Sequence, residues 1–385
     1  TTAASNTAVG TDCLYGNTTG TGNTAVGREC LDANTTGAYN TAVGLQALGA
    51  ATTPNYNTAV GQAALYSCTT GETNTAVGAS ALSSNTTGHY NSAVGYWAMT
   101  QNTTGERNAA LGRESLKNNT TGNYNVACGM DAMIGNTTSS NNVAIGYQAL
   151  ATITTAGDAS TAVGYKALKS ANNDSYNTAV GHESMTACTS GRACTAVGTD
   201  SLYTLTTGQR CTAVGQGAGR DVSSGDDNIG IGYNALRTNS PSGSVSTSSG
   251  VLCLGDDNTA SFYCNDTSIS SSDQRDKTDF TEWTHGLDWI NKLKPITYRW
   301  DKRSWYEDRT PDGSKKNSRL HLGFKAQEVL AIEQADGYGS KKDDMLLINL
   351  NEDNTAYGMK YERLVVVLTK AVQELSAKVT ALEGT

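Results

Sequence analysis

A tetrapeptide of the form Thr-Ala-Val-Gly recurs along most of this 385-residue chain. Fourteen copies are present, and of the thirteen spacings between them twelve are 17 residues and one is 18. Residues 23–39 show the full unit, Asn-Thr-Ala-Val-Gly-x-x-Ala-Leu-x-x-Asn-Thr-Thr-Gly-x-Tyr, with Cys30 in the second Ala place. So regular a period is typical of repeat architectures in which each unit contacts only its neighbours. The copies end at Gly10, Gly27, Gly44, Gly61, Gly78, Gly95, Gly112, Gly129, Gly146, Gly164, Gly181, Gly198, Gly215 and Gly232.

The 17-residue unit is too short for a pair of helices, and its Gly and Asn at fixed places would interrupt a helix. Two short strands joined by two turns fit the unit, because Gly adopts positive φ at no steric cost and Asn bonds to nearby backbone groups. We therefore expect a mainly β fold in which residues 1–255 form a β-solenoid, one coil per unit. Coils stacked about 4.8 Å apart would make a rod of roughly 65 to 70 Å.

Stacked coils place equivalent residues above one another, so that identical side chains form ladders. The Asn that opens the unit can bond along the axis, and we expect Ala and Val to fill a thin interior. Because so slim a coil buries few apolar groups, we expect three chains to associate, with the Leu of the Ala-Leu pair contacting neighbouring chains. The Asn ladder begins Asn6, Asn23, Asn40, Asn57, Asn74 and Asn91, and the Leu ladder begins Leu14, Leu31, Leu48, Leu65 and Leu82.

The nine cysteines are an odd number, and they include neither a CxxC pair nor a Cys/His cluster with zinc-like spacing. Most stand where the repeat carries another small residue: Cys13 and Cys30 replace Ala, and Cys194 and Cys211 replace the first Asn. We interpret them as small core residues rather than disulfides or metal ligands. We expect no cofactor and no metal.

The formal net charge of -8 and the pI near 5.1 provide no basic patch for nucleic acid or for an anionic membrane. No apolar run approaches the roughly 20 residues that a membrane helix needs. Residues 1–10 have neither a basic nor an apolar segment of the kind found in signal peptides. We therefore expect no nucleic-acid partner and no membrane insertion.

The composition changes near Gly250, after a stretch rich in Ser and Gly, and charged residues and Trp become common from Asp273 onward. We expect a linker over residues 256–271 and a small α+β domain over residues 272–385. Its last segment, residues 362–383, carries apolar residues at alternating spacings of four and three, which predicts a coiled-coil helix. These residues are Leu368, Val372, Leu375, Val379 and Leu382. We expect four tryptophans, Trp283, Trp289, Trp300 and Trp305, to build the core of this domain rather than a sugar platform.

Four ordered blocks of the C-terminal region resemble the endosialidase-type intramolecular chaperones. The first, Ser-Ser-Asp-Gln-Arg-Asp-Lys at residues 271–277, is similar to that family's Ser-Asp-x-Arg-x-Lys signature. The others are Leu-Lys-Pro-Ile-Thr-Tyr-Arg-Trp at 293–300, Leu-Gly-Phe-Lys-Ala-Gln-Glu-Val at 322–329 and Tyr-Glu-Arg-Leu at 361–364. The resemblance implies that the chain cuts itself once, between Ser271 and Ser272.

The residue types of the motif suit such a cut. A Ser hydroxyl needs a nearby base, and Lys277 can serve as that base if burial lowers its pKa. The resemblance then implies that Ser272 attacks the carbonyl of Ser271, giving an ester that water hydrolyses, and Arg275 is a candidate donor to the oxyanion. Asp273 completes the motif. The alternative reading is that Ser272 begins a helix with a solvated charged face. The motif predicts a single-turnover serine autoprotease and no multiple-turnover activity.

The repeats themselves resemble the β-roll heads of trimeric autotransporter adhesins, and similar repeats occur in phage fibres. Together the two resemblances imply a homotrimeric bacteriophage tail fibre, part of the virion and made in the host cytoplasm. Its expected partners are phage tail or baseplate proteins and a host-surface receptor, expected to be a carbohydrate. A bacterial adhesin stalk and a polysaccharide-degrading tailspike are the alternatives.

A tailspike would need paired acids in a groove. Acids recur two places after the repeat Gly on adjacent coils, as Asp12/Glu29, Glu114/Asp131 and Glu183/Asp200. Recurrence at one repeat position favours a tolerated surface site over a catalytic one. Ladders of Tyr39, Tyr56, Tyr90 and Tyr124 are expected to cover the roll rather than bind sugar.

Overall fold

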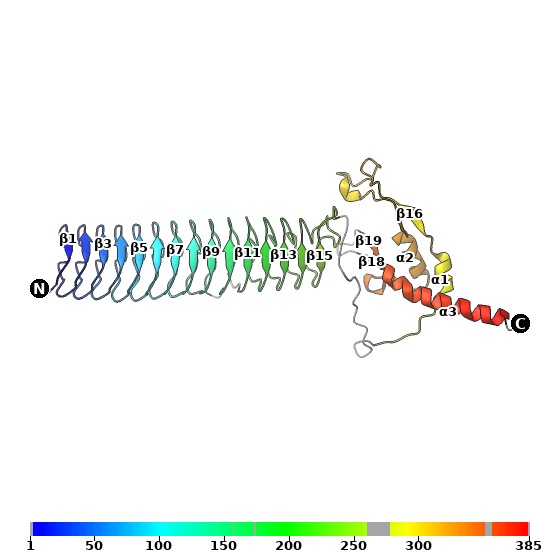
Figure 1. Ribbon diagram of the computed structural model, residues 1–385, viewed down its shortest axis with the longest axis horizontal. Coiled ribbons are helices and arrows are strands. Elements are labelled where there is room, and N and C mark those ends of the chain that lie inside the picture. Colours follow the sequence, from blue (N-terminus) through cyan, green and yellow to red (C-terminus); the bar gives the residue numbers. More distant parts are fainter. Residues whose placement is uncertain (1–2, 156, 173–174, 260–277, 351–355, 384–385) are drawn as a thin grey trace. The chain divides into compact units, whose positions relative to one another are not determined.

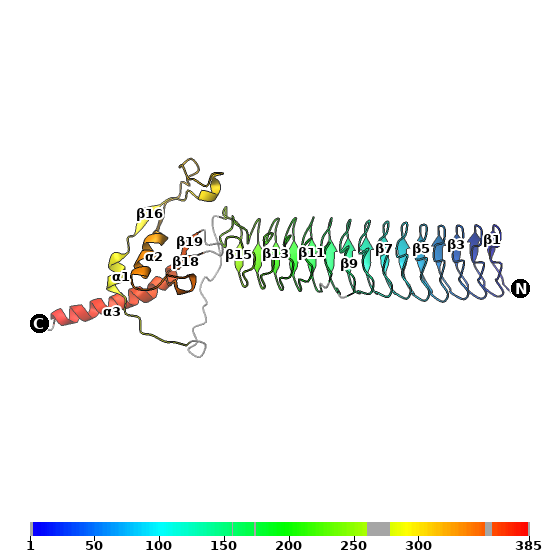
Figure 2. The ribbon, with the colours of Figure 1, turned by 180° about the vertical axis from the view of Figure 1, so that it is seen from behind.

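The computed structural model describes residues 3–155, 157–172, 175–259, 278–350 and 356–383. The chain divides into two compact units, Thr1–Asp256 and Asp257–Thr385. The first unit is a parallel β-solenoid, and the second contains three helices and two small sheets among its described residues (Figures 1 and 2). The predicted mainly β class, with a small helix-containing C-terminal region, is confirmed.

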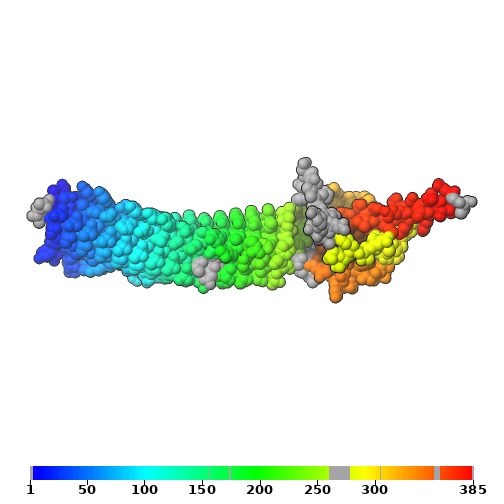
Figure 3. Space-filling model, turned by 90° about the horizontal axis from the view of Figure 1, so that it is seen from below, coloured from blue at the N-terminus to red at the C-terminus, as the bar shows by residue number. Residues whose placement is uncertain are grey.

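Each coil of the solenoid contributes one strand of three residues, and the fifteen strands form a single parallel sheet in chain order. Neighbouring strands pair in register, so that Thr24 lies opposite Thr41 and Val26 opposite Val43. Figure 3 shows the stacked coils as a rod of nearly even width. The strands are β1 (Thr7–Val9), β2 (Thr24–Val26), β3 (Thr41–Val43), β4 (Thr58–Val60), β5 (Thr75–Val77), β6 (Ser92–Val94), β7 (Ala109–Leu111), β8 (Val126–Cys128), β9 (Val143–Ile145), β10 (Thr161–Val163), β11 (Thr178–Val180), β12 (Thr195–Val197), β13 (Thr212–Val214), β14 (Ile229–Ile231) and β15 (Leu252–Leu254).

The prediction of two strands per coil is wrong, because the segment after each strand follows a series of turns. In the third coil Gln46 and Leu48 adopt left-handed φ of 57° and 51°, which prevents an extended run. These turns still bond to both neighbouring coils: the Gln46 N–H donates to the Arg28 carbonyl at 2.9 Å, and the Leu48 N–H to the Ala64 carbonyl at 3.0 Å. Inter-coil hydrogen bonds offset the cost of the left-handed residues.

The predicted Asn ladder is confirmed. Asn40 shows the pattern: its backbone N–H donates to Oδ1 of Asn23 at 2.9 Å, and its own Oδ1 accepts the backbone N–H of Asn57 at 3.0 Å. Its Nδ2 donates to the carbonyl of Pro54 at 2.7 Å. Each buried amide therefore links three consecutive coils and leaves few buried polar groups without a partner.

The interior is filled by Ala and Leu rather than by Ala and Val. Ala42, in the middle of β3, is fully buried, so Val43 must point to the other face of the strand, where it is partly exposed. Leu48 is fully buried inside its own coil. The predicted contact of the Leu ladder with neighbouring chains is therefore wrong: Leu31, Leu48, Leu65 and Leu82 are inaccessible, and Leu14 in the first described coil is partly buried against the same core.

The eight cysteines within the described residues are free thiols. Most lie in the solenoid core, including Cys30, Cys68 and the stacked pair Cys194 and Cys211. Burial raises the pKa of Cys68 to about 11. The thiols therefore occupy the small-residue places that their positions in the repeat predict.

The second unit is built from short elements around one core. Helix α1 (Leu287–Lys292) packs on α3 (Leu364–Glu383), and α2 (Ala326–Ala335) contacts both strands of one sheet. The sheets are two antiparallel pairs, β16 (Ile296–Tyr298) with β17 (His321–Gly323), and β18 (Ile348–Leu350) with β19 (Tyr357–Met359). Single 3-10 turns are η2 (Arg303–Trp305), η3 (Lys342–Asp344) and η4 (Tyr361–Arg363). The predicted final helix is confirmed.

The core of this unit contains only part of the predicted tryptophan set. Trp289 is buried and Trp283 packs against it, whereas Trp300 is 45% exposed and Trp305 lies outside the core. The buried apolar residues are Trp289, Val329, Leu330, Met345, Leu347, Ile348, Leu364 and Val367. Among the described residues, no helix is both long and apolar enough to cross a bilayer.

Candidate functional site

The predicted cleavage motif lies outside the described residues. This applies to Ser271, Ser272, Asp273, Arg275 and Lys277, since the described chain resumes at Thr278. Their roles as scissile residue, nucleophile, oxyanion donor and base remain predictions. The described residues nevertheless define the part of the unit to which the motif is joined.

The first contact after the motif is the junction between α1 and α3. Gly286 lies so close to α3 that a Cβ there would be 2.7 Å from the backbone nitrogen of Ala371. Beside it, the backbone N–H of Leu287 donates to Oε2 of Glu374 at 2.9 Å. Gly286, where the chain crosses α3, and Glu374 on α3 therefore fix the position at which the chain after the motif contacts this helix.

Four aromatic rings surround this junction. Trp283 packs edge-on against Trp289, with ring centroids 5.0 Å apart and planes at 89°. His285 lies 5.5 Å from Trp289, and Tyr338 lies 5.8 Å from Trp283. Edge-to-face arrangements of this kind are the favoured packing of aromatic rings. The cluster holds the segment from Trp283 to α1 against the end of α2.

The same aromatic cluster also has hydrogen bonds and ion pairs to nearby charged side chains. Oδ2 of Asp336 accepts Nε1–H of Trp289 at 2.6 Å, and Lys292 lies 3.8 Å from that oxygen. Nδ1 of His285 is 3.0 Å from Oδ2 of Asp288 and 3.9 Å from Asp336. Burial raises the pKa of Asp288, but the hydrogen bonds from His285 and from the Trp289 backbone outweigh that effect, so the pKa is lowered. His285 is thus a structural partner of two carboxylates.

His285, Asp288 and Asp336 are close enough together to be candidate metal ligands. Both carboxylates are already engaged, Asp288 with His285 and Asp336 with Trp289, which explains the cluster without an ion. Two carboxylates therefore pair with His285, one near it in the sequence and one distant. Asp288 could have been found from its i+3 spacing, whereas Asp336 comes close only through packing of α2.

Glu333 on α2 is a buried structural residue that no sequence pattern indicated. It is fully buried, and its two carboxylate oxygens accept the backbone N–H groups of Leu346 and Leu347 at 3.1 and 2.5 Å. The carboxylate thereby fixes the segment that leads into β18. Charged hydrogen bonds of this kind are short and strong.

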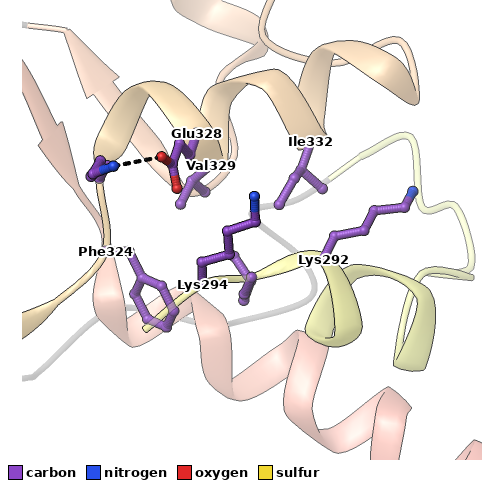
Figure 4. Close-up of a pocket in the computed structure, with 8 residues that line it drawn as sticks. Lys292, Lys294, Phe324, Glu328, Val329 and Ile332 are labelled. Carbon is purple, nitrogen blue, oxygen red and sulfur yellow. Dashed lines mark hydrogen bonds and ion pairs between the residues drawn. The ribbon is translucent and has the colours of Figure 1, made fainter. Parts of the chain in front are cut away.

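A small pocket separates α2 from the segment that follows α1. Figure 4 shows Lys292, Lys294 and Phe324 facing Val329 and Ile332, with Glu328 held by Lys325 at 2.8 Å. Its volume of about 10 Å³ corresponds to roughly one water molecule. The pocket is therefore too small to bind a substrate.

The helix α3 has two apolar sides. Leu364, Val367 and Ala371 are buried in the unit, and the predicted coiled-coil residues lie on a neighbouring side, since Leu368 and Leu375 follow the buried Leu364 and Ala371 by four positions each. We call these residues, all 43 to 76% exposed, the α3 stripe. The stripe consists of Leu368, Val372, Leu375, Val379 and Leu382. The C-terminal half of α3 extends past α1 in both views (Figures 1 and 2).

One acid of each recurring pair in the solenoid has a basic partner or lies beside one: Glu29 pairs with Arg28, Glu114 with Arg113 and Lys117, and Asp200 with Arg220. Glu114 contacts Arg113 at 2.7 Å and Lys117 at 3.1 Å, and these partners lower its pKa. Asp200 lies 3.9 Å from Arg220. His182, Glu183 and Asp200 also form a candidate group of ligands on adjacent coils, but exposed groups of this kind are common without an ion. Glu114 is therefore engaged within its own coil, and Asp200 with a residue of the next coil.

The tyrosine ladders are inter-coil contacts too. Tyr39 stacks on Tyr56 with ring centroids 5.3 Å apart. Farther along, the guanidinium of Arg107 lies 5.4 Å from the rings of both Tyr90 and Tyr124. The ring faces that meet a neighbouring ring or a guanidinium are closed to a sugar, while the four side chains as a whole are 52 to 60% exposed. This arrangement is consistent with the prediction that the ladders cover the roll.

Comparison with known families identifies the second unit. Residues 272–338 match the peptidase S74 family, described as chaperone of endosialidase. The C-terminal region of this protein is therefore similar to chaperone-of-endosialidase domains over these residues, and a β-solenoid precedes it. No curated protein and no solved structure matches the chain.

Proposed function

We propose that this protein is a fibre subunit of a bacteriophage tail, whose C-terminal domain directs trimer assembly and then releases itself by one cut between Ser271 and Ser272. The observation that carries the proposal is a boundary: the family match begins at residue 272, which is the Ser of the Ser-Asp-x-Arg-x-Lys motif. A match that starts at the nucleophile is expected if the domain begins where the chain is cut.

The cut is an acyl shift followed by hydrolysis. Ser272 Oγ attacks the carbonyl carbon of Ser271 while Lys277 takes the hydroxyl proton, and Arg275 stabilises the oxyanion. Collapse breaks the peptide C–N bond, the amine of Ser272 takes a proton, and an ester joins the two residues. Water then hydrolyses the ester, leaving the carboxylate of Ser271 and the free hydroxyl of Ser272.

The solenoid explains why a chaperone is needed. Its coils are nearly identical, so a chain shifted by one coil against its neighbours keeps almost every contact. A helical domain with local contacts folds faster than a long parallel sheet and can set the register first. The α3 stripe supplies a surface for this step, because two heptads of exposed Leu and Val need partner helices. Removing the domain afterwards would trap the assembled fibre kinetically.

The proposed role in the phage particle follows from the combination of a long solenoid and a chaperone domain that is removed. A trimeric rod that no longer needs its chaperone is suited to a virion, where it joins tail or baseplate proteins at one end and a host-surface receptor, expected to be a carbohydrate, elsewhere. The engaged acids of the coils do not favour a polysaccharide-degrading tailspike.

The cut is tested by intact mass and denaturing gels on the wild type beside Ser272→Ala and Lys277→Ala, with Ser270→Ala as the matched control. We expect the wild type and the control to yield fragments 1–271 and 272–385, and the two other variants to stay whole. Arg275→Ala should slow the cut. An uncut wild type, or fragments in Ser272→Ala, would contradict the proposed chemistry.

Trimer assembly is tested separately by native mass measurement. Leu375→Glu places a charge in the α3 stripe and should yield monomers or aggregates. Gln373→Glu adds the same charge on an exposed position of the helix outside the stripe and should leave the trimer intact. A trimer that survives Leu375→Glu would show that the stripe does not assemble the chains.

A further inference from the structure

The exposed aliphatic side chains of the solenoid gather on one face. In β2–β15 the middle residue points inward and is buried, so the first and third residues point outward, whereas all three residues of β1 are exposed. We call these outward residues of β1–β15 the strand face. Among the described residues of the solenoid, every exposed large aliphatic side chain except Met130 belongs to it. These are Val9, Val60, Val94, Leu111, Val126, Ile145, Val197, Val214, Ile229, Ile231, Leu252 and Leu254.

The residues that replace Thr and Val at the outward strand positions indicate that the strand face is shielded from water. Where the first Thr of the strand is lost, it is replaced by Ser, Ala, Val, Ile or Leu, and where the third Val is lost it becomes Leu, Ile or Cys. None of the 45 strand residues is charged. Charges occur close by, since Glu106 and Arg107 precede the first residue of β7 by three and two positions. A strand face in water would be expected to accept charged residues as the neighbouring turns do.

The size of the strand face fits a stable interface. It offers two side chains on each of fifteen strands, thirty in all. A standard protein interface uses about 20 to 30 residues on each side. At about 4.8 Å between strands the face is roughly 67 Å long, far longer than a single ligand. Twenty of these thirty side chains are apolar and ten are Thr or Ser, and extended exposed apolar surfaces mark interaction sites.

We propose that the strand face is where the shafts of the fibre meet, each chain turning it toward the two other copies around the trimer axis. The proposal rests on the trimer of the proposed function and assigns its interface. A second copy is the partner that fits, because the face repeats with the coil period over its whole length. Only another in-register solenoid presents the same period at every coil, whereas a globular partner would match a few coils.

A native cysteine on the strand face can be used to test this arrangement of the three chains. Cys128 is the third residue of β8, so its thiol belongs to the strand face, and it is partly exposed. Cys253 is the middle residue of β15 and is buried. Among the described residues, Cys128 is the one cysteine on the outward positions of the strands. In a parallel, in-register trimer the three Cys128 thiols meet at one height near the axis.

The experiment is cross-linking of the full chain with a short bismaleimide, read on a denaturing gel beside native mass measurement. We expect covalent dimers from the wild-type trimer and none from Cys128→Ser. A trimer in which Cys128 is labelled but never cross-linked would overturn the strand face as the interface while leaving the trimer itself in place. A monomeric wild type would overturn both proposals.

Paired variants provide a second measurement. Val94→Lys puts a charge on the strand face of β6, and Thr104→Lys puts the same charge on an exposed turn of the same coil. We expect Val94→Lys to shorten the regular trimeric shaft or abolish it, because an unpaired charge would be buried. Thr104→Lys should assemble like the wild type. Equal assembly of both variants would contradict the proposal.

Discussion

Oε2 of Glu374 on α3 accepts the backbone N–H of Leu287 at 2.9 Å and so fixes the start of α1. We expect Glu374→Ala to lower the free energy of unfolding of the C-terminal unit by about 1 to 2 kcal/mol, because the N–H loses a charged acceptor. Tryptophan fluorescence during urea unfolding of the full chain is the measurement, since four of the five tryptophans lie in this unit. Gln373→Ala, one residue away and exposed, should change little. Equal stability of both variants would show that the bond is dispensable.

Gly286 provides a steric test of the same junction. A Cβ at this residue would lie 2.7 Å from the Ala371 nitrogen and 2.8 Å from the Lys370 carbonyl carbon, both backbone atoms that cannot rotate away. We expect Gly286→Ala to destabilise the unit by about 1 to 3 kcal/mol, as overpacking does. Gly358→Ala is the matched control, because its nearest neighbours are 3.9 Å away. The same urea titration measures both, and a larger loss for Gly358→Ala would contradict the predicted clash.

The Asn ladder predicts a graded series of variants. Oδ1 of Asn91 accepts the backbone N–H of Asn108 at 3.0 Å, and its Nδ2 donates to the carbonyl of Gly105 at 2.8 Å. Asn91→Ala should cost about 1 to 3 kcal/mol for each buried group that it leaves unpaired. Asn91→Ser should cost less, because the chain uses Ser160 at the same position, where its hydroxyl accepts the N–H of Asn177 at 3.2 Å. Thermal unfolding followed by circular dichroism gives the order, and an Asn91→Ser chain no more stable than Asn91→Ala would contradict it.

Cys68 reports on opening of the coils. Its thiol is fully buried, and its pKa of about 11 leaves only about one thiolate in a thousand at pH 8. We expect iodoacetamide to leave Cys68 unmodified in the folded chain at pH 8 and to modify it fully in guanidinium. Peptide mass analysis after timed labelling is the measurement. Modification of the folded chain at the rate of an exposed thiol would show that this coil opens readily.

The solenoid could be predicted from the sequence because the pattern that specifies it is local and repeats in every coil. The spacing of Gly27, Gly44 and Gly61 fixes the coil, and the solenoid needs glycine there: Gly44 has φ of 129°, and a Cβ would lie 2.7 Å from the Gly61 backbone. The Asn ladder followed from the same period. The C-terminal helix was predicted from the spacing of its apolar residues, which is again a local property.

The sequence alone also provided the cleavage motif, which stays a prediction because residues 271–277 lie outside the described part of the chain. The contacts between side chains within the C-terminal unit could not be predicted from a sequence motif. Asp336 meets His285 and Trp289, and Glu333 meets Leu347, only because α2 packs between distant segments. No periodicity relates residues that are so far apart in the chain.

The direction in which each side chain of the coil points was decided by the tertiary structure. The sequence shows that Ala42 must oppose Val43 across the strand, because neighbouring side chains alternate. It does not show which of them faces inward. That depends on the width of the closed coil, where the left-handed turn at Leu48 brings the larger side chain inside and leaves room for only Ala on the strand. The repeat by itself determined the solenoid, and closure of the coil decided that Leu fills its core while Val lies on its surface.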